Sequence, residues 1–255
     1  MSFRSAARTH VGTVRQRNED AVLDRAEIGL WAVADGAGGH ERGDYASARI
    51  VGALGEVDPA LHGVALLDEV KTRLREVNLE LRAKAATIGP GALIGSTVAV
   101  LLILGNQGYC LWVGDSRFYR MRAGQLRQLS RDQSHVQDLV DRGEIAPEAA
   151  ATHVLVNIVT NLVGASDELI LEERQDRIEP GDVLLLCTDG LSGVVADFEI
   201  AEILRETPVV AAADRLIERA LACGARDNVS TVVVGYTGPN NGVQLRTALL
   251  SPLRR

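Results

Sequence analysis

The sequence predicts an α+β fold in which two antiparallel β-sheets pack face to face and helices cover both outer sides. Four apolar runs follow one another between residues 96 and 129, with links of only two or three residues. Links this short require antiparallel neighbours, which disfavours an alternating strand–helix array. Because the strands are apolar on both faces and helical patterns flank them, we expect a four-layer αββα sandwich.

The N-terminal third predicts three short strands and two helices. The strands cover residues 9–14, 21–26 and 28–35, and polar or glycine breaks separate them. A first helix begins near Glu41, and its expected packing face combines polar and small residues: Tyr45, Ala48, Arg49 and Gly52. A second helix over 64–86 carries apolar residues at three-to-four spacing, namely Leu67, Val70, Leu74, Val77 and Leu81.

The remaining sequence completes one domain over residues 1–237. The elements expected are strands over 96–104, 108–113, 117–122, 125–129, 169–175, 182–187 and 229–236, and helices over 135–142, 198–206 and 209–223. Residues 144–161 show no single period, so we predict a mobile helical segment within a flap of about 134–165. Residues 238–255 mix turn formers, proline and basic groups, which predicts a flexible C-terminal tail.

Composition excludes several functional classes. The chain has 255 residues, 46% hydrophobic and 24% charged, and a formal net charge of −7 without a Lys/Arg block, which disfavours nucleic-acid binding. The longest apolar run, 98–104, is far shorter than the roughly 20 residues that a membrane helix needs. The N-terminus has no signal-peptide pattern, and the three cysteines have no metal-binding or redox spacing, so we expect a cytoplasmic protein.

Acidic residues stand at the ends of apolar runs in four distant segments. Asp35 and Asp189 each follow such a run and precede a glycine, Asp227 precedes the last run, and Glu19 and Asp20 precede an early one. A single Asp-Gly pair is more often a plain turn. Four acidic segments placed alike are more simply explained by a divalent cation, which would offset their mutual repulsion.

The neighbours of these acids refine the expectation. Gly36 leaves its backbone carbonyl open, and a carboxylate beside a carbonyl suits Mg²⁺ or Mn²⁺. Glu19 and Asp20 are adjacent on an expected strand, so they point to opposite faces and suit water-mediated better than direct binding. Arg15 lies four residues before Glu19, on the same side of a strand. Its guanidinium would form a salt bridge or bind phosphate, and the sequence does not distinguish these two interpretations.

Seven motifs then give the chain a family resemblance. In order they are RQRNED, ADGAGGH, GSTVAV, VGDSRFYR, LSRDQSHVQDLVDRGEI, CTDGLSGVV and RDNVSTVVV. Together, over about residues 9–236, they resemble the metal-dependent type 2C Ser/Thr protein phosphatases in their compact bacterial form. The resemblance implies hydrolysis of phosphoserine and phosphothreonine by direct attack of a metal-bridging water. It also implies a phosphoprotein substrate, either a bacterial Ser/Thr kinase or its targets, and a monomer.

The resemblance implies a binuclear Mn²⁺ or Mg²⁺ centre with a possible third ion. Asp35 would bridge the two ions, the Gly36 carbonyl would bind one of them, and Asp189 and Asp227 would bind the other. The remaining assignments are Glu19 and Asp20 to metal waters, Arg15 to the substrate phosphate, Asp115 with Asp189 to the third ion, and Asn228 and Thr97 to the lining of the site. For Thr97, inside an apolar strand, we expect a structural role.

Two departures from the family pattern stand out. Animal members carry a histidine where this chain has Ala37, which leaves His40 as an auxiliary acid or substrate-positioning residue, or as a cap of the following helix. In the flap, Val154, Val156 and Asn161 replace the proline and two arginines of bacterial relatives, so the flap is more apolar and suited to docking a specific protein.

Two other functions remain open. A non-catalytic module that keeps the fold and binds a partner is disfavoured by the intact Asp35, Gly36, Asp189 and Asp227. A metal phosphoesterase acting on a small molecule would use the same metal chemistry, so the sequence does not separate it from a protein phosphatase.

Overall fold

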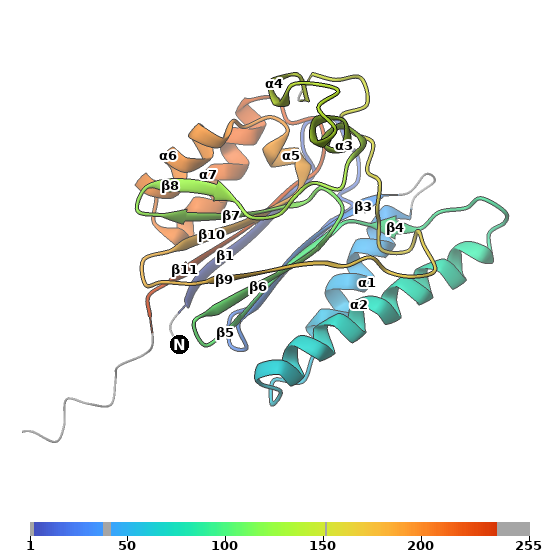
Figure 1. Ribbon diagram of the computed structural model, residues 1–255, viewed down its shortest axis with the longest axis horizontal. Helices are drawn as coiled ribbons and strands as arrows, with labels where there is room; N and C mark the ends of the chain where they lie inside the picture. Colours follow the sequence, from blue (N-terminus) through green and yellow to red (C-terminus); the bar gives the residue numbers. More distant parts are fainter. Residues whose placement is uncertain (1–2, 38–41, 151, 239–255) are drawn as a thin grey trace, which may run out of the picture.

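The computed structural model describes residues 3–37, 42–150 and 152–238, and its strands form two antiparallel sheets (Figure 1). The first sheet contains, in spatial order, β1 (Phe3–His10), β11 (Val229–Tyr236), β10 (Val183–Cys187), β7 (Arg117–Arg122) and β8 (Gln125–Gln128). The second contains β2 (Asp20–Arg25), β3 (Leu30–Ala37), β5 (Val98–Leu104), β6 (Gln107–Val113) and β9 (Glu172–Arg177), and β4 (Gly95–Ser96) pairs with β3. The expected tail from residue 239 onward and His40 lie outside the described residues.

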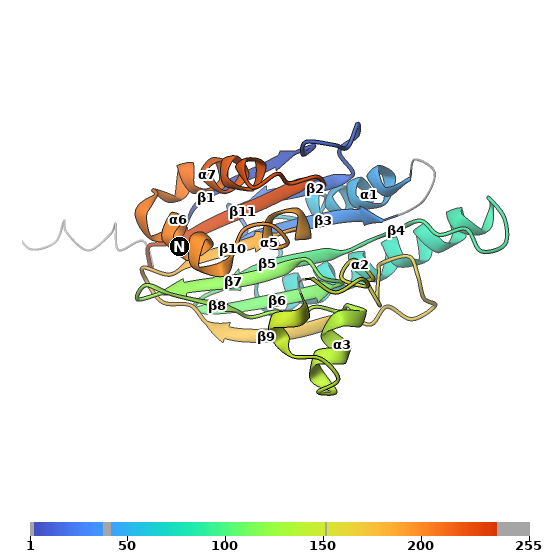
Figure 2. The same cartoon turned by 90° about the horizontal axis from the view of Figure 1, so that it is seen from above.

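Helices cover the outer face of each sheet (Figures 1 and 2). On the second sheet lie α1 (Gly43–Gly55) and α2 (Gly63–Ala86), and on the first lie α6 (Asp197–Glu206) and α7 (Val209–Ala222). A short α5 (Asp189–Ser192) follows β10, while α3 (His135–Asp141) and α4 (Pro147–Ala150) belong to the flap at one end of the molecule. The predicted four-layer α+β sandwich is therefore confirmed.

Three apolar cores separate the four layers, and strand alternation explains them. In β5, Val98, Val100 and Leu102 pack against α1 and α2, while Ala99, Leu101 and Ile103 pack between the sheets. A third core joins the outer face of the first sheet to α6 and α7. Because side chains alternate along a strand, an uninterrupted apolar run such as β5 fills two cores at once.

The first strand differs from its prediction. It covers Phe3–His10 and pairs with β11 over its whole length, instead of lying at 9–14. Gly12 ends it with φ +79°, and any side chain there would overlap the Asp227 carbonyl. Residues 11–19 therefore form a loop. The prediction that Arg15 and Glu19 lie on the same side of a strand is wrong.

Helix α1 buries a different face from the one predicted. Its buried residues include Ala46, Ile50 and Leu54, whereas Ala48 is exposed. The polar members of the predicted face, Tyr45 and Arg49, instead hydrogen-bond Glu80 on α2, at 2.8 Å each. The predicted face therefore makes a polar contact between helices, and the neighbouring stripe packs on the sheet.

The flap has less helix than expected. Within 144–161 only α4 is helical, and the remaining described residues form turns tied down by an isolated bridge between Ser134 and Val159. Asn161 donates hydrogen bonds to Gln133 and to the Ile170 carbonyl, so it has a structural role there. The following strand begins at Glu172 rather than at 169.

A contact between two glycines fixes the entrance to the acidic turn. A side chain added to Gly36, near the end of β3, would overlap the Gly43 carbonyl at the start of α1. A side chain added to Gly43 would in turn overlap the Gly36 carbonyl. Gly36 is therefore required for this close approach of helix and strand, in addition to leaving its carbonyl open.

None of the described helices is both long and apolar enough to cross a membrane. The three cysteines are free thiols: Cys110 and Cys187 are buried, and Cys223 is exposed at the end of α7.

Candidate functional site

Five aspartates from separate elements converge at the end of the sandwich that carries the flap. Asp20 and Asp35 are partners in the β2–β3 register, Asp189 begins α5, Asp227 precedes β11, and Asp115 lies in the β6–β7 link. The negative charges of the other four act on the Asp35 carboxyl. The aspartates that the sequence places at strand ends are thus brought together, and Asp115 with them.

Asp20 is held between the two sheets by hydroxyl groups. One of its carboxylate oxygens, Oδ2, accepts hydrogen bonds from Thr188 Oγ1 at 2.9 Å and Ser230 Oγ at 2.6 Å, both from the opposite sheet. The other oxygen, Oδ1, is buried without a partner. Thr188 and Ser230 were not predicted from the sequence, because a hydroxyl at the end of one strand shows no pattern that relates it to an acid on the opposite sheet.

Glu19 points away from Asp20, as expected for adjacent residues. Its side chain lies at the N-terminus of α1, where the Gly43 backbone donates a hydrogen bond to it. Burial raises the pKa of Glu19, and the nearby Asp44 raises it further. Glu19 therefore lies beside the aspartate cluster, with its carboxyl directed at the helix.

Burial and mutual repulsion raise the pKa of every clustered aspartate for which a shift is resolved. Burial is the main cause for Asp20 and Asp115, whose pKa values both rise to about 7, and Asp189 adds repulsion to each. The pKa of Asp35 rises well above its ordinary value, by burial first and then by repulsion from Asp20. Burial and Asp227 also raise the pKa of Asp189. The site therefore stabilises its negative charge poorly.

Arg15 forms an ion pair with one aspartate of this cluster, Asp227. Its Nε donates to Asp227 Oδ1 at 2.9 Å and its Nη2 to Oδ2 at 2.8 Å, a bidentate pair. The side chains are 57% and 45% exposed, so solvent weakens the pair. Of the two readings of Arg15, the structure contains the salt bridge, and it places the guanidinium at the rim of the acidic cluster.

Asn228 and Thr97 support the loops that carry the acids. Asn228 accepts from the Glu19 backbone at 2.7 Å and donates to the carbonyls of Val11 and Arg17, which pins the loop containing Arg15. Thr97 bonds to Asp35 through two backbone contacts, of which Thr97 N to Asp35 O is 2.8 Å. Through these hydrogen bonds, Thr97 and Asn228 hold the backbone of the segments that carry Asp35, Glu19 and Arg15.

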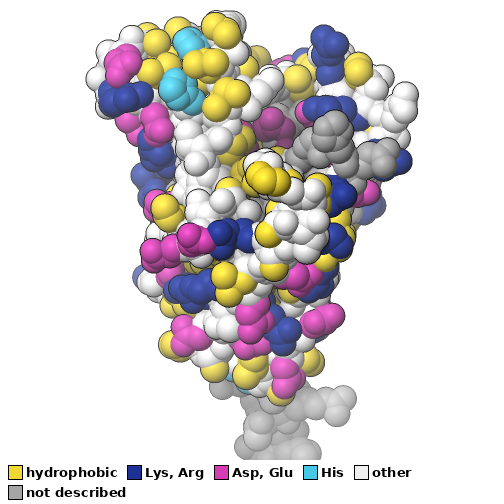
Figure 3. Space-filling view, turned by 90° about the vertical axis from the view of Figure 1, so that its right-hand side faces the viewer, with side chains coloured by type: hydrophobic (Ala, Val, Ile, Leu, Met, Phe, Trp, Pro, Cys, Tyr) yellow, Lys and Arg dark blue, Asp and Glu magenta, His cyan; other side chains and the backbone are white. Residues whose placement is uncertain are grey.

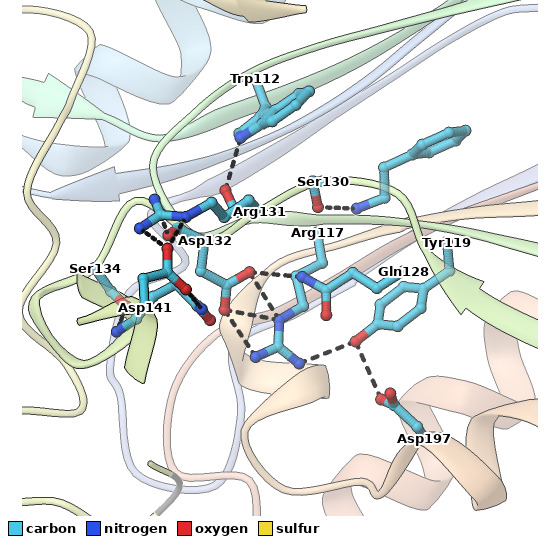
Figure 4. Close-up of polar contacts among 12 residues, drawn as sticks. Trp112, Arg117, Tyr119, Gln128, Ser130, Arg131, Asp132, Ser134, Asp141 and Asp197 are labelled. Carbon is cyan, nitrogen blue, oxygen red and sulfur yellow. Dashed lines mark hydrogen bonds and ion pairs between the residues drawn. The ribbon is translucent and has the colours of Figure 1, made fainter. Parts of the chain in front are cut away.

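A partly buried ion pair between Arg117 and Asp132 lies next to Asp115, and the sequence did not predict it (Figure 4). Arg117 Nη2 donates to Asp132 Oδ2 at 2.8 Å, and Nε contacts both carboxylate oxygens. Gln128 donates to the same carboxylate, and Arg117 continues to the Tyr119 hydroxyl, which donates to Asp197 at 3.2 Å. This network fixes the β7 end beside Asp115.

The residues present fit a divalent cation. Two buried carboxylate oxygens, Asp20 Oδ1 and Asp189 Oδ1, have no hydrogen-bond partner, and the donor set consists of hard oxygens. Within the described residues, no group of three or more Asp, Glu, His or Cys side chains is placed so that it could hold a metal ion. Both carboxylate oxygens of Asp227 are engaged by Arg15.

The pKa shifts predict a pH-dependent response to metal. A carboxyl whose folded-state pKa is raised contributes stability below its unfolded pKa near 4, and this contribution is lost as pH rises through about 7. We expect Mn²⁺ at about 100 times its Kd to raise the Tm by about 5–10 °C at pH 7.5. At pH 6.0 the gain should be smaller, because protons compete for the same oxygens. Thermal melts with Mn²⁺ or EDTA measure this, and an equal gain at both pH values would contradict it.

A cluster of aspartates, two of them buried, therefore lies at one end of an αββα sandwich. The sequence profile described as Protein phosphatase 2C matches residues 7–233, and the chain belongs to this family.

Named relatives agree with this assignment. The chain is 40% identical to the serine/threonine protein phosphatase PstP of Mycobacterium tuberculosis over 232 residues, which are 91% of this chain and 44% of the relative. It is 32% identical to the serine/threonine phosphatase stp of Listeria monocytogenes over 235 residues, covering 89% of this chain and 93% of that protein. The chain thus spans less than half the length of the PstP relative.

Solved structures share the fold. PppA, described as a key regulatory component of T6SS in Pseudomonas aeruginosa, superposes with a TM-score of 0.85 at 41% identity, covering 92% of this chain and 98% of that chain. The catalytic domain of PstP in complex with 2 manganese ions superposes with a TM-score of 0.82 at 37% identity, covering 91% and 97%.

Proposed function

We propose that this chain is a metal-dependent serine/threonine protein phosphatase, which hydrolyses phosphoserine and phosphothreonine in proteins. The observation that carries the proposal is the aspartate cluster with two buried, unpartnered carboxylate oxygens. Related proteins bear the names of Ser/Thr phosphatases, and the structure of one of them contains two manganese ions. Manganese-dependent release of phosphate from a phosphothreonine peptide tests the proposal, and no release at saturating Mn²⁺ would contradict it.

The proposed ligands are those at the strand ends. Asp35, the Gly36 carbonyl, Asp189 and Asp227 would hold two Mn²⁺ or Mg²⁺ ions, while Glu19 and Asp20 would hold their waters. Asp115 and Asp189 together would bind a third ion. Ionising the buried Asp115 carboxyl costs free energy, which a bound cation would offset. When bound, such ions lower the pKa of water and stabilise charge on the phosphoryl group.

The protein's own side chains would position a metal-binding carboxylate and the substrate phosphate. Thr188 and Ser230 hold Asp20 through its Oδ2, and its Oδ1 has no hydrogen-bond partner and would face a metal-bound water. Arg15 would bind the substrate phosphate, since its planar fork matches a phosphate as well as the carboxylate it now contacts. For His40 we propose an auxiliary acid or substrate-positioning role, because Ala37 stands where animal relatives carry a histidine.

The proposed biological setting follows from the substrate. A phosphatase for phosphoserine and phosphothreonine reverses a Ser/Thr kinase, so its substrates would be that kinase or its targets. We propose that the chain acts as a monomer in the cytoplasm, where free thiols such as Cys110, Cys187 and Cys223 persist. Among the described residues, no contact favours a non-catalytic module or a small-molecule phosphoesterase.

Removal of the Arg15 guanidinium should weaken substrate binding. Charge-assisted hydrogen bonds contribute about 1.5–3 kcal/mol, so Arg15→Ala should raise the KM for a phosphothreonine peptide by about tenfold or more, with a smaller effect on kcat. Steady-state kinetics on peptide and Mn²⁺ titrations measure this.

The matched control is Arg8→Ala. Arg8 also pairs with an aspartate, Asp214, and the two side chains are 47% and 48% exposed, but the pair lies between β1 and α7. The control should keep the KM of the unmodified protein. An unchanged KM in Arg15→Ala would leave Arg15 as a salt-bridge residue only.

A further inference from the structure

A pocket of about 480 Å³ opens between the flap and the aspartate cluster, and we call it the flap pocket. At one side it reaches Asp115 and Asp189 of the cluster. Its other side is apolar and comes from α3, α4 and the turns that follow: Val136, Val140, Pro147, Ala150 and Val156. Its volume falls within the roughly 300–1,000 Å³ of typical ligand pockets.

A second pocket, the arginine pocket, adjoins the flap pocket, and Asp189 lines both. We call the two pockets together the groove. The arginine pocket, of about 520 Å³, is lined by Arg15, Arg226 and Asp227. Both pockets share Asn157, Asp189 and Gly193. Figure 3 shows the same arrangement as a hollow with acidic side chains at its floor, a rim rich in hydrophobic side chains on the flap side, and Lys/Arg side chains on the other. The groove therefore has a cationic end and an apolar end.

The polar residues of the flap pocket do not make it a site for a charged group. Arg117 lines the pocket, but its guanidinium is engaged by Asp132 and the Tyr119 hydroxyl (Figure 4). Asp132 in turn accepts from Gln128. This pair is already satisfied internally, so on the flap side the apolar side chains are the main groups that still gain from contact with a ligand.

Val156 shows that the apolar wall is available. Val156 is 38% exposed. It stands where the family resemblance leads us to expect an arginine. Burying the valine against an aliphatic side chain is favourable, at roughly 25 cal/mol per Å² of apolar surface. A charged substrate side chain placed against this apolar wall would lose hydration.

We propose that the flap pocket binds an aliphatic side chain of the phosphoprotein substrate, within two residues of the phosphorylated serine or threonine. The proposal rests on the proposed phosphatase function. The phosphoryl group must lie at the aspartate cluster, and the pocket begins at two of those aspartates. An extended peptide advances about 3.3 Å per residue, so a neighbouring side chain reaches the pocket while the phosphate stays at the cluster.

The test compares phosphothreonine peptides that differ at one position. Leu and the similarly sized polar Asn are placed in turn at each of the two residues before and after the phosphothreonine, with saturating Mn²⁺. We expect kcat/KM to be about tenfold higher for Leu than for Asn at one or more of these positions, the usual gain from an apolar pocket. The double variant Val140→Ser/Val156→Ser should bring this ratio close to one.

The matched control is the double variant Val64→Ser/Val210→Ser, two exposed valines on α2 and α7 away from the groove, which should keep the Leu preference. Equal kcat/KM for Leu and Asn at all four positions would overturn the proposal, as would a preference that survives in Val140→Ser/Val156→Ser. Hydrolysis of p-nitrophenyl phosphate separates the two levels. If the protein hydrolyses it but shows no peptide preference, only this inference fails; if no substrate releases phosphate, the proposed function fails as well.

Discussion

Replacing Asp189 by Asn is expected to reduce manganese-dependent phosphate release by at least about 10³-fold, the upper range for removal of one electrostatic group from an active site. Asp189 lies at the centre of the groove, and its buried Oδ1 has no protein partner. Asn has nearly the same shape but no charge, so it should remove a metal ligand without leaving a cavity. Phosphate release from a phosphothreonine peptide measures the loss.

A stability measurement separates this loss from misfolding. Burial and the charge of Asp227 raise the pKa of Asp189, so its ionised form costs free energy in the metal-free protein. Asp189→Asn should therefore melt no lower than the unmodified protein in EDTA, and it should lose most of the Tm gain with Mn²⁺. The matched control is Asp214→Asn, which changes one member of the exposed Arg8–Asp214 pair between β1 and α7. It should retain activity. Equal activity of Asp189→Asn and the unmodified protein would contradict the proposed metal centre.

The second large effect concerns folding stability at Asp132. Asp132→Ala would leave the Arg117 guanidinium without its main partner in a position where only 27% of its side chain is exposed. Loss of one member of a buried pair typically costs about 3–5 kcal/mol. We expect the free energy of unfolding to fall by about 3 kcal/mol, and the Tm of a chain of this size by about 6–12 °C.

Chemical denaturation of the metal-free protein measures this change. The control is Asp138→Ala, which removes one partner of Arg131 on the surface of the flap, where both side chains are more than 40% exposed. Exposed pairs contribute about 1 kcal/mol or less, and Arg131 keeps Asp141 as a second partner. A loss below 1 kcal/mol for Asp132→Ala would show that Arg117 is well solvated or finds another partner.

The sequence predicted most reliably the features with long or repeated patterns. The second helix was expected over 64–86 and is observed at Gly63–Ala86, because its apolar spacing continues for several turns. The acidic cluster was predicted because Asp20, Asp35, Asp189 and Asp227 each follow or precede an apolar run. These are local signals that tertiary structure preserves.

Features that depend on a distant partner were not predictable. Asp132 stands in a polar stretch and looks like a surface residue, until β7 brings Arg117 against it. The face of α1 was misassigned because small residues occur on two neighbouring stripes, and only the sheet decides which is buried. The first strand was predicted too late in the chain, because the sequence does not show that the backbone turns at Gly12, where it lies close to the Asp227 carbonyl.

The mutual contact of Gly36 and Gly43 has a consequence for protein engineering and for sequence drift. Each glycine excludes a side chain on the other, so no enlargement at one position is relieved by a second change at its partner. A library that varies the acidic turn should therefore hold both positions constant and draw its diversity from the surrounding loop. In a saturation screen, we expect these two positions to tolerate the fewest amino acids along the turn, even where the readout is yield of folded protein alone.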